Sequence, residues 1–305
     1  MIRRFLSSYG IFVALVIECA LLGLATDTFL TASNLANVLR QNAFTAILAA
    51  GMTFAILTGG IDLSVGSLVA LSGVVCADVL SRGGGLALGV GAGLLVGVAA
   101  GCANGLVVTK VGIPPFVVTL AMMLIARGAA YKYTDARTIS GLPASFAALG
   151  VGLAPTAIMA AVFALAWLLL VRTPFGRHVY AIGGNREAAW LAGIRVNRVL
   201  LEVYVLCGAC AGLAGVLVAS RLNAGYPKAG EFYELDAVTA VVVGGTSLFG
   251  GRGSIWGTLA GAFFIGILNN GLNLFHVEHY DQLVVKGVVL LLAASLDRWR
   301  SEAGG

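Results

Sequence analysis

Charged residues are scarce in this sequence. They make up 11% of the 305 residues, whereas a typical soluble domain has about 25%. Hydrophobic residues reach 59% and the mean hydropathy is +0.95. A chain with so few charges cannot cover an apolar core with a hydrated surface. The composition therefore excludes an ordinary water-soluble domain and predicts a protein embedded in the lipid bilayer.

Lysine is especially rare, and its placement excludes one kind of nucleotide site. Only four lysines occur, and none follows a glycine: they are Lys110, Lys132, Lys228 and Lys286. The P-loop pattern GxxxxGK[ST], which cradles the phosphates of ATP, is therefore absent. We expect this chain to bind no cofactor, so any ATP-driven step must use another subunit.

Residue sets that bind metals or perform nucleophilic catalysis are missing as well. The CxxC pair Cys207 and Cys210 lies in an apolar run without nearby histidines, which favours a packing role. His276, Glu278 and His279 have no further ligand at useful spacing. The basic residues give a net charge of +5 but form no stripe with aromatics. We therefore expect no metal, no enzyme activity and no nucleic-acid partner.

What the sequence has instead is a series of apolar runs of 17–24 residues, close to the roughly 20 helical residues that cross a bilayer. Because an isolated strand cannot satisfy its backbone in lipid, we predict an all-α polytopic membrane protein with one transmembrane domain over residues 1–305. The ten predicted spans are 9–27, 43–59, 62–81, 86–109, 114–131, 153–171, 199–220, 234–249, 254–274 and 282–297.

The longest polar stretch, residues 172–198, contains five arginines and is predicted to be a loop. If the N-terminus is cytoplasmic, eleven basic residues fall at cytoplasmic positions and seven at external ones. Cytoplasmic loops of membrane proteins carry an excess of Lys and Arg. We therefore expect this loop and both termini to face the cytoplasm.

Glycines recur at helical spacing within the fourth predicted span. The series is Gly89, Gly93, Gly97, Gly101 and Gly105. Such a ridge lets a second helix approach closely. Static packing is the favoured interpretation, and sliding of helices during transport is the alternative.

The segment TGGIDLSVGS at 58–67 places Asp62 and Ser64 between two apolar runs. A carboxylate there must face protein, water or a helix end. Two interpretations stay open: the pair caps the following helix, or it lies on a substrate path.

The same region suggests an internal repeat. Residues 55–70 can be aligned with 240–257, so that Gly59-Gly60 matches Gly244-Gly245 and Gly66-Ser67 matches Gly253-Ser254. Repeats are common in transporters, although chance matching of glycine-rich apolar sequence is the alternative.

Four asparagines at membrane depth are further candidates for the substrate path: Asn104, Asn269, Asn270 and Asn273. An amide both donates and accepts hydrogen bonds, as a polyhydroxylated ligand requires. Residues 269 and 273 share one helical face. Hydrogen bonding between helices is the competing interpretation.

A short helix is predicted inside the 172–198 stretch. Asn185 is a suitable N-cap, the following REAAWLA sequence favours a helix, and Gly193 is a suitable stop. Its mixture of apolar and charged residues suits docking into a groove of a soluble partner. A helix lying on lipid headgroups fits equally well.

Four motifs in order resemble the permease subunit of bacterial ABC importers for ribose and related monosaccharides. They are TGGIDLSVGS at 58–67, VTKVGIPPFVVTL at 108–120, GRHVYAIGGNREAAWLAGI at 176–194 and VVVGGTSLFGGRGS at 241–254. The resemblance runs from about residue 30 to the last span.

This resemblance implies an inner-membrane permease that pairs with a second permease as a homodimer or a heterodimer. It implies a separate cytoplasmic ATPase subunit that holds ATP and Mg²⁺. It also implies a periplasmic or surface sugar-binding protein. The helix at 185–193 would be the coupling element that enters the ATPase, although Trp190 departs from the polar residue expected there. The implied coupling residues are Arg177, Asn185, Arg186, Glu187, Ala188, Ala189, Trp190 and Gly193.

The expected function is therefore uptake of a pentose, hexose or related polyol by alternating access. A branched-chain amino acid permease is the nearest alternative. A proton-driven carrier is less favoured, because Glu18 and Asp78 do not form the paired carboxylate relay that it would need.

Overall fold

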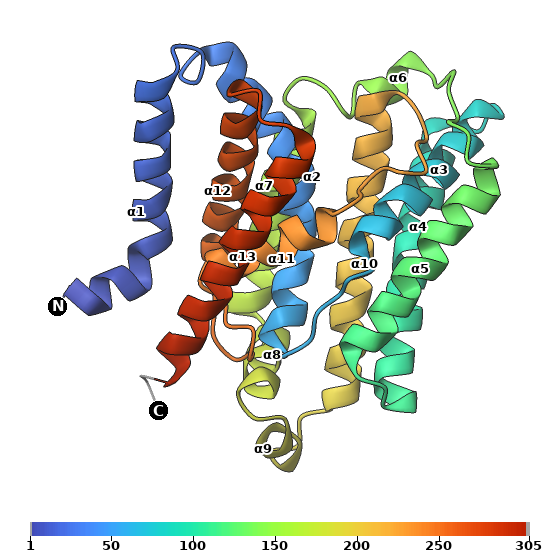
Figure 1. Ribbon diagram of the computed structural model, residues 1–305. Coiled ribbons are helices and arrows are strands. Elements are labelled where there is room, and N and C mark those ends of the chain that lie inside the picture. Colours follow the sequence, from blue (N-terminus) through green and yellow to red (C-terminus); the bar gives the residue numbers. More distant parts are fainter. Residues whose placement is uncertain (1, 303–305) are drawn as a thin grey trace.

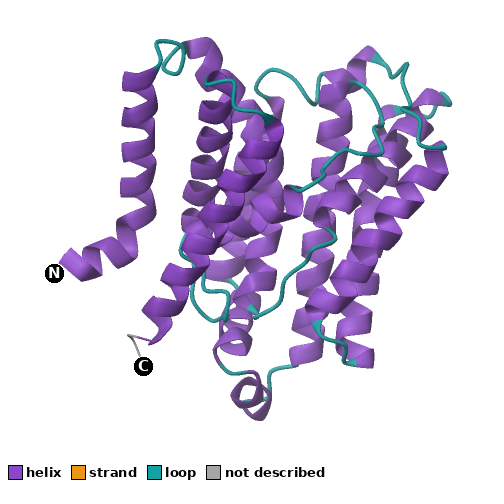
Figure 2. Ribbon diagram, viewed as in Figure 1, coloured by secondary structure: helices purple, strands orange, loops and turns teal. Residues whose placement is uncertain are grey.

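A computed structural model describes residues 2–302, which form a bundle of helices (Figures 1 and 2). The prediction of an all-α membrane protein is confirmed. The helices are α1 (Ile2–Ala25), α2 (Ala32–Leu57), α3 (Val65–Ser81), α4 (Leu86–Leu106) with a π-helical extension (Val107–Val111), α5 (Pro115–Thr134), α6 (Ala144–Ala147), α7 (Ala154–Arg172), α8 (Pro174–Gly184), α9 (Arg186–Leu191), α10 (Val196–Leu222), α11 (Tyr233–Val243), α12 (Ile255–Leu274) and α13 (His279–Glu302).

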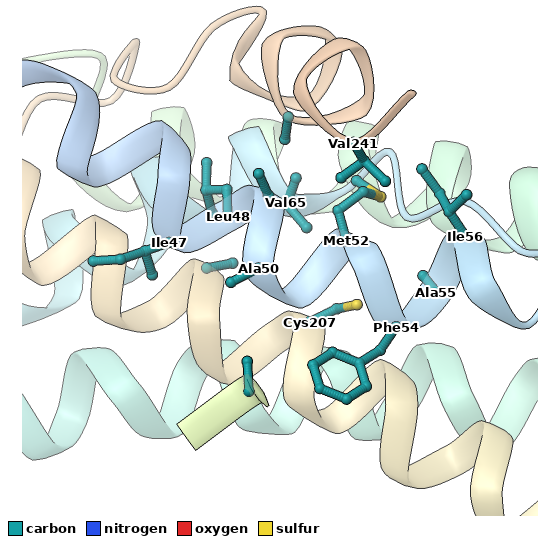
Figure 3. Packing of buried hydrophobic residues seen from close by; sticks show 14 of the residues in the cluster. Ile47, Leu48, Ala50, Met52, Phe54, Ala55, Ile56, Val65, Cys207 and Val241 are labelled. Carbon is teal, nitrogen blue, oxygen red and sulfur yellow. The ribbon is translucent and has the colours of Figure 1, made fainter. Parts of the chain in front are cut away.

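Helix α2 forms the centre of the bundle. Every residue from Ala46 to Leu57 is buried, and the helix packs against α7, α10, α11 and α12. Figure 3 shows its side chains in one apolar cluster with Cys207 of α10 and Val241 of α11. The thiol of Cys207 donates to the carbonyl oxygen of Gly51 at 3.1 Å. This buried cysteine therefore serves helix packing, as its apolar sequence context predicted.

The number of ten spans is not confirmed. Within the described residues, six helices are long and apolar enough to cross a membrane: α4 with its extension, α5, α7, α10, α12 and α13. Helix α2 is longer than predicted, since it begins at Ala32 rather than at residue 43. The first turns of α2 carry several polar residues, so they were left outside the predicted spans; among these residues, Asn34 and Asn42 are buried.

Two predicted spans are short helices that begin inside the bundle. Helix α11 has 11 residues and is about 16 Å long, which is about half of the hydrocarbon thickness. Non-helical segments at 58–64 and 223–232 lead into α3 and α11 (Figure 1). Irregular backbone at this depth is tolerated where protein buries it. The span predicted at 234–249 is therefore wrong in extent, and the one at 62–81 starts at Val65.

The glycine ridge of α4 is a packing surface. A Cβ atom on Gly97 would lie 2.2 Å from the carbonyl oxygen of Gly208, and one on Gly101 would lie 2.3 Å from that of Tyr204. Both partners belong to α10. The absence of side chains lets the two backbones touch, so the favoured packing interpretation agrees with the structure.

The two stretches that the proposed repeat aligns, 55–70 and 240–257, have similar but not equivalent structures. Each contains the end of a helix, followed by a glycine with positive φ, Gly59 at 77° and Gly245 at 90°. However, Gly66 lies in the first turn of α3, whereas Gly253 precedes α12. The glycines that the alignment pairs therefore do not have equivalent positions.

One end of the bundle carries α8, α9, the start of α1 and the end of α13 (Figure 1). The connections around 107–114 and 244–254 lie at the same end, and those at 26–31, 135–153 and 275–278 lie at the other. The stretch at 172–198 is thus a pair of short helices rather than a loop, because Pro174 and Arg186 each start a helix. We call this end the α9 end.

Candidate functional site

Three of the predicted path residues meet in a fully buried cluster. Asp62, Ser64 and Asn104 are each 0% exposed. The Asp62 Oδ1 atom accepts hydrogen bonds from the Ser64 amide at 3.0 Å and the Ser64 hydroxyl at 2.5 Å. The Asn104 amide donates to the same hydroxyl at 3.0 Å. The cluster therefore joins the 58–64 segment to α4.

The capping interpretation needs correction. Ser64 is the N-cap residue of α3, but its side chain makes no capping hydrogen bond, because the hydroxyl is turned toward Asp62. Asp62 accepts from the amide two residues further on, which is the hydrogen bond of an Asx turn. The pair therefore shapes the turn before α3 instead of capping its first turn.

Neighbouring helices hold the same segment from other sides. The Thr119 hydroxyl of α5 donates to the carbonyl oxygen of Ile61 at 3.1 Å. The Tyr204 hydroxyl of α10 lies 2.5 Å from the position that a Cβ atom on Gly60 would occupy. It is buried without a hydrogen-bond partner in the described chain. Tyr204 was missed by sequence analysis, although a single tyrosine within an apolar run is a detectable signal.

The three other asparagines line a separate cavity of about 470 Å³. It lies between α2, α10, α11, α12 and α13, and its lining is rich in polar side chains. These are Gln41, Asn42, Thr45, Arg221, Tyr226, Tyr233, Asp236, Asn269, Asn270, Asn273, His279, Gln282 and Lys286. We call it the polar cavity. The structure therefore does not bring the six predicted path residues into one site.

Two of these asparagines connect helices, as the competing interpretation proposed. Asn270 and Asn34 of α2 exchange two amide hydrogen bonds of 2.9 Å each. Asn273 accepts from Gln282 of α13 at 2.9 Å. Asn269 differs, because its buried Oδ1 atom has no partner within the described residues, and the same holds for Asn42 Nδ2. These two amides retain hydrogen-bonding capacity for a ligand.

An ion pair that sequence analysis missed lines the polar cavity. Lys286 Nζ lies 3.0 Å from Asp236 Oδ2, and the side chains are only 20% and 8% exposed. The pair joins α13 to α11. The two residues are 50 positions apart, and no local pattern in the sequence showed that they meet. Ionised groups at such depth are stable only when paired.

The segment 223–232 that enters the bundle before α11 is fixed by α5. Arg127 Nη1 donates to the carbonyl oxygens of Pro227 and Ala229, at 2.9 Å each. In the sequence, Arg127 is one of the seven basic residues counted at external positions. The structure gives it a specific role in holding the backbone that borders the polar cavity.

The carboxylates considered for proton transport lie on different helices. Asp78 accepts hydrogen bonds from Tyr133 at 2.6 Å and from Arg82 at 2.9 Å, and this contact raises the pKa of the Arg82 guanidinium. Glu18 is on α1, where it borders a groove against α12. The two carboxylates therefore form no relay with each other.

The predicted short helix at the α9 end is present. Asn185 Oδ1 accepts from the Ala188 amide at 2.9 Å, so Asn185 is the N-cap. The helix ends at Leu191, and Gly193 follows with φ 84°, a conformation suited to glycine. Trp190 and Leu191 are 66% and 72% exposed. Helix α9 therefore presents an apolar pair at the tip of the bundle.

Helix α8 connects α9 to the bundle core through close backbone contacts. A Cβ atom on Gly183 would overlap the carbonyl oxygen of Leu57 and lie 2.4 Å from the Gly251 amide. Tyr180 donates from its hydroxyl to the carbonyl oxygen of Gly253 at 2.9 Å. Displacement of α8 would therefore act directly on the end of α2 and on the loop before α12.

A bundle of apolar helices with a polar cavity and an exposed helix at one end defines a polytopic membrane permease. Residues 34–294 match the family described as branched-chain amino acid transport system, permease component. The chain is 48% identical to the ribose import permease of Bacillus subtilis, over 96% of this chain and 93% of that protein.

Other relatives extend the same pattern. Identity is 45% to the ribose import permease of Escherichia coli K12, over 93% of this chain and 92% of the relative. It is 39% to the L-arabinose transport system permease of that organism, over 98% and 93%. No solved structure gives a match. The chain belongs to the family of permeases of ribose-type ABC importers.

Proposed function

We propose that this chain is the permease subunit of a bacterial importer that carries a monosaccharide across the inner membrane. The observation that supports the substrate class is near full-length similarity to permeases named for ribose, allose and arabinose. All three names describe monosaccharides, although the family description mentions branched-chain amino acids. The protein works as a transporter and catalyses no reaction itself.

The energy for transport comes from ATP and Mg²⁺ bound by a separate cytoplasmic ATPase. The α9 end, with both termini, faces the cytoplasm, as the excess of basic residues there supports. Trp190 and Leu191, exposed at the tip of α9, enter a groove on the ATPase. Arg177 of α8 and Arg186 and Glu187 of α9 supply charged contacts to the ATPase, while Asn185, Ala188, Ala189 and Gly193 fix the helix geometry.

Movement of α9 reaches the transport path through α8. The contact of Gly183 with Leu57 and Gly251 transmits displacement to the 58–64 segment and to the loop before α12. Asp62, Ser64 and Asn104 then hold the 58–64 segment in one conformation. A second copy of the permease completes the path, and a periplasmic or surface binding protein delivers the sugar.

The polar cavity is part of the substrate path. Its volume of about 470 Å³ lies in the range of small-molecule sites. The unpartnered amide atoms of Asn42 and Asn269 provide a donor and an acceptor for sugar hydroxyls. The ion pair of Asp236 and Lys286 adds charged hydrogen-bonding groups at the wall of the cavity.

Mutation tests the assignment of path residues. Asn269→Ala should reduce uptake without changing the amount of assembled complex, and Asp62→Ala should impair it by releasing the 58–64 segment. Asn37→Ala is the control, because Asn37 is exposed on α2 and its side chain accepts a hydrogen bond from Arg40, the residue one turn further along the same helix. If Asn269→Ala and Asp62→Ala both transport at the rate of Asn37→Ala, the assignment is wrong.

The substrate class is tested with the reconstituted complex of permease, ATPase and binding protein. ATP hydrolysis is measured with a panel of pentoses, hexoses, polyols and branched-chain amino acids. Stimulation by one or more monosaccharides and by no amino acid is expected. Stimulation by leucine or valine alone would favour the amino acid alternative.

A further inference from the structure

A continuous groove lies between α7, α8 and α10 beside the α9 end. It consists of two adjoining cavities of about 450 and 390 Å³, which share Phe175 and Glu202. The cavity near α9 is lined by His178, Arg195 and Arg198. The second cavity extends along α10 and is apolar, lined by Leu169, Leu201, Val205 and Leu206.

We propose that this groove binds one anionic phospholipid such as phosphatidylglycerol. The phosphate contacts Arg195 and Arg198, and one acyl chain fills the apolar cavity between α7 and α10. Basic pockets between helices at the cytoplasmic surface are suited to such headgroups. The basic cavity lies near α9, where the lipid headgroup would bind. The apolar cavity lies further along α10, where an acyl chain would bind.

The charges that face the groove favour an anion. Arg198 donates from Nε to Glu202 Oε1 at 2.9 Å, so this carboxylate already has a cationic partner. The Arg195 side chain makes no ion pair within the described residues, and it is exposed. Two guanidinium groups against one carboxylate leave the groove with a net positive charge. The positive end of the 27-residue helix α10 begins at the same place.

The apolar part points to a lipid rather than to a soluble partner. Residues 201–206 lead away from the α9 end, because α10 begins there at Val196 and ends at Leu222 near the other end of the bundle (Figure 1). On α7, Leu165 lies one turn before the groove residue Leu169 on the same helical face and is 58% exposed, so the apolar surface continues beyond the groove. An acyl chain would lie along this apolar surface, whereas a soluble protein docked on α9 would meet the basic part of the groove, which Gly193 also lines.

This inference does not depend on the proposed sugar transport, since it concerns a groove outside the polar cavity. It is tested by photo-crosslinking of the purified full-length chain in phosphatidylcholine vesicles. One sample contains a trace of phosphatidylglycerol with a photoreactive acyl chain, and the other contains photoreactive phosphatidylcholine. Mass spectrometry then locates the labelled peptides.

Labelling by phosphatidylglycerol is expected on residues 199–206 and 165–171, several-fold above labelling by phosphatidylcholine. The double variant Arg195→Gln, Arg198→Gln should reduce it by roughly 30-fold, given the affinity that each basic residue contributes near an anionic surface. Val205→Trp should reduce labelling by filling the apolar cavity. Arg252→Gln is the matched control, because Arg252 is exposed at the same end but does not line the groove.

Three results would overturn the proposal. Equal labelling by the two lipids would show that the arginines do not select an anion. An equal loss with Arg252→Gln would show a general attraction of this surface for negative charge. Complete loss of labelling after addition of the ATPase subunit would show that the groove is a surface for that partner.

Discussion

The amide of Gly251 donates a 2.9 Å hydrogen bond to the carbonyl oxygen of Leu57, the last residue of α2. This bond joins the loop before α12 to the end of the central helix, and α8 packs directly onto it through Gly183. In the proposed mechanism, movement of α9 displaces α8. Through this contact, α8 then displaces the end of α2 and the loop before α12.

Gly183→Ala tests this contact. The added methyl group would overlap the Leu57 carbonyl and the Gly251 amide, so we expect a loss of about 1–3 kcal/mol in stability and a loss of sugar-stimulated ATP hydrolysis. Gly184→Ala is the control, since a Cβ atom at Gly184 would meet nothing within 4 Å. The melting temperature and the ATPase rate of both variants are measured. If the two variants had the same melting temperature and the same ATPase rate, the Gly183 contact would have no role in coupling.

Trp190→Ala tests the docking of α9. Because Trp190 is 66% exposed, its removal should leave the melting temperature of the isolated permease unchanged. A central aromatic residue at an interface often contributes about 2 kcal/mol or more, so the affinity for the ATPase should fall by about 30-fold or more. Titration with the purified ATPase gives this affinity. Leu153→Ala, at an 82% exposed residue of the opposite end, should have no effect on it.

Glu187→Ala and Gly193→Ala address coupling itself. We expect both variants to insert into the membrane normally and to lose the link between ATP hydrolysis and transport. Gly193→Ala acts through the positive φ of 84° that the residue must adopt. Membrane fractionation and uptake are measured together. Loss of insertion would mean that residues 172–198 only determine topology.

Lys286→Gln tests the ion pair of the polar cavity. Removal of the cation leaves Asp236 buried without its partner, which typically costs about 3–5 kcal/mol. The double variant Asp236→Asn, Lys286→Gln should regain most of this stability, because both charges are then absent. Thermal unfolding of the single and double variants gives the coupling energy. Additive effects of the two substitutions would show that the pair does not interact.

Gly97→Ala tests the contact between α4 and α10. A methyl group there would come within 2.2 Å of the Gly208 carbonyl oxygen, so the melting temperature should fall. Gly91→Ala is on the same helix with nothing within 4 Å. It should be neutral or slightly stabilising, because alanine favours the helix by up to about 1 kcal/mol. A similar decrease for both would contradict the packing described.

Local features of this protein were predictable and distant contacts were not. Asn185 and Gly193 identified helix α9 because caps and stops are encoded by neighbouring residues. The α4 glycines revealed their role by spacing alone. By contrast, α11 resembled a full span because apolar composition does not show whether a helix begins inside the bundle. The pairing of Asp236 with Lys286 depends on residues 50 positions apart, which no local pattern connects.

The most direct test of the account is sugar uptake into proteoliposomes that contain the permease, its ATPase and the binding protein. The measured quantity is accumulation of a labelled pentose or hexose, with and without ATP inside the vesicles and with the proton gradient abolished. We predict uptake that requires ATP, persists without the gradient and is lost in Trp190→Ala. Uptake that needs no ATPase and disappears with the proton gradient would contradict the account.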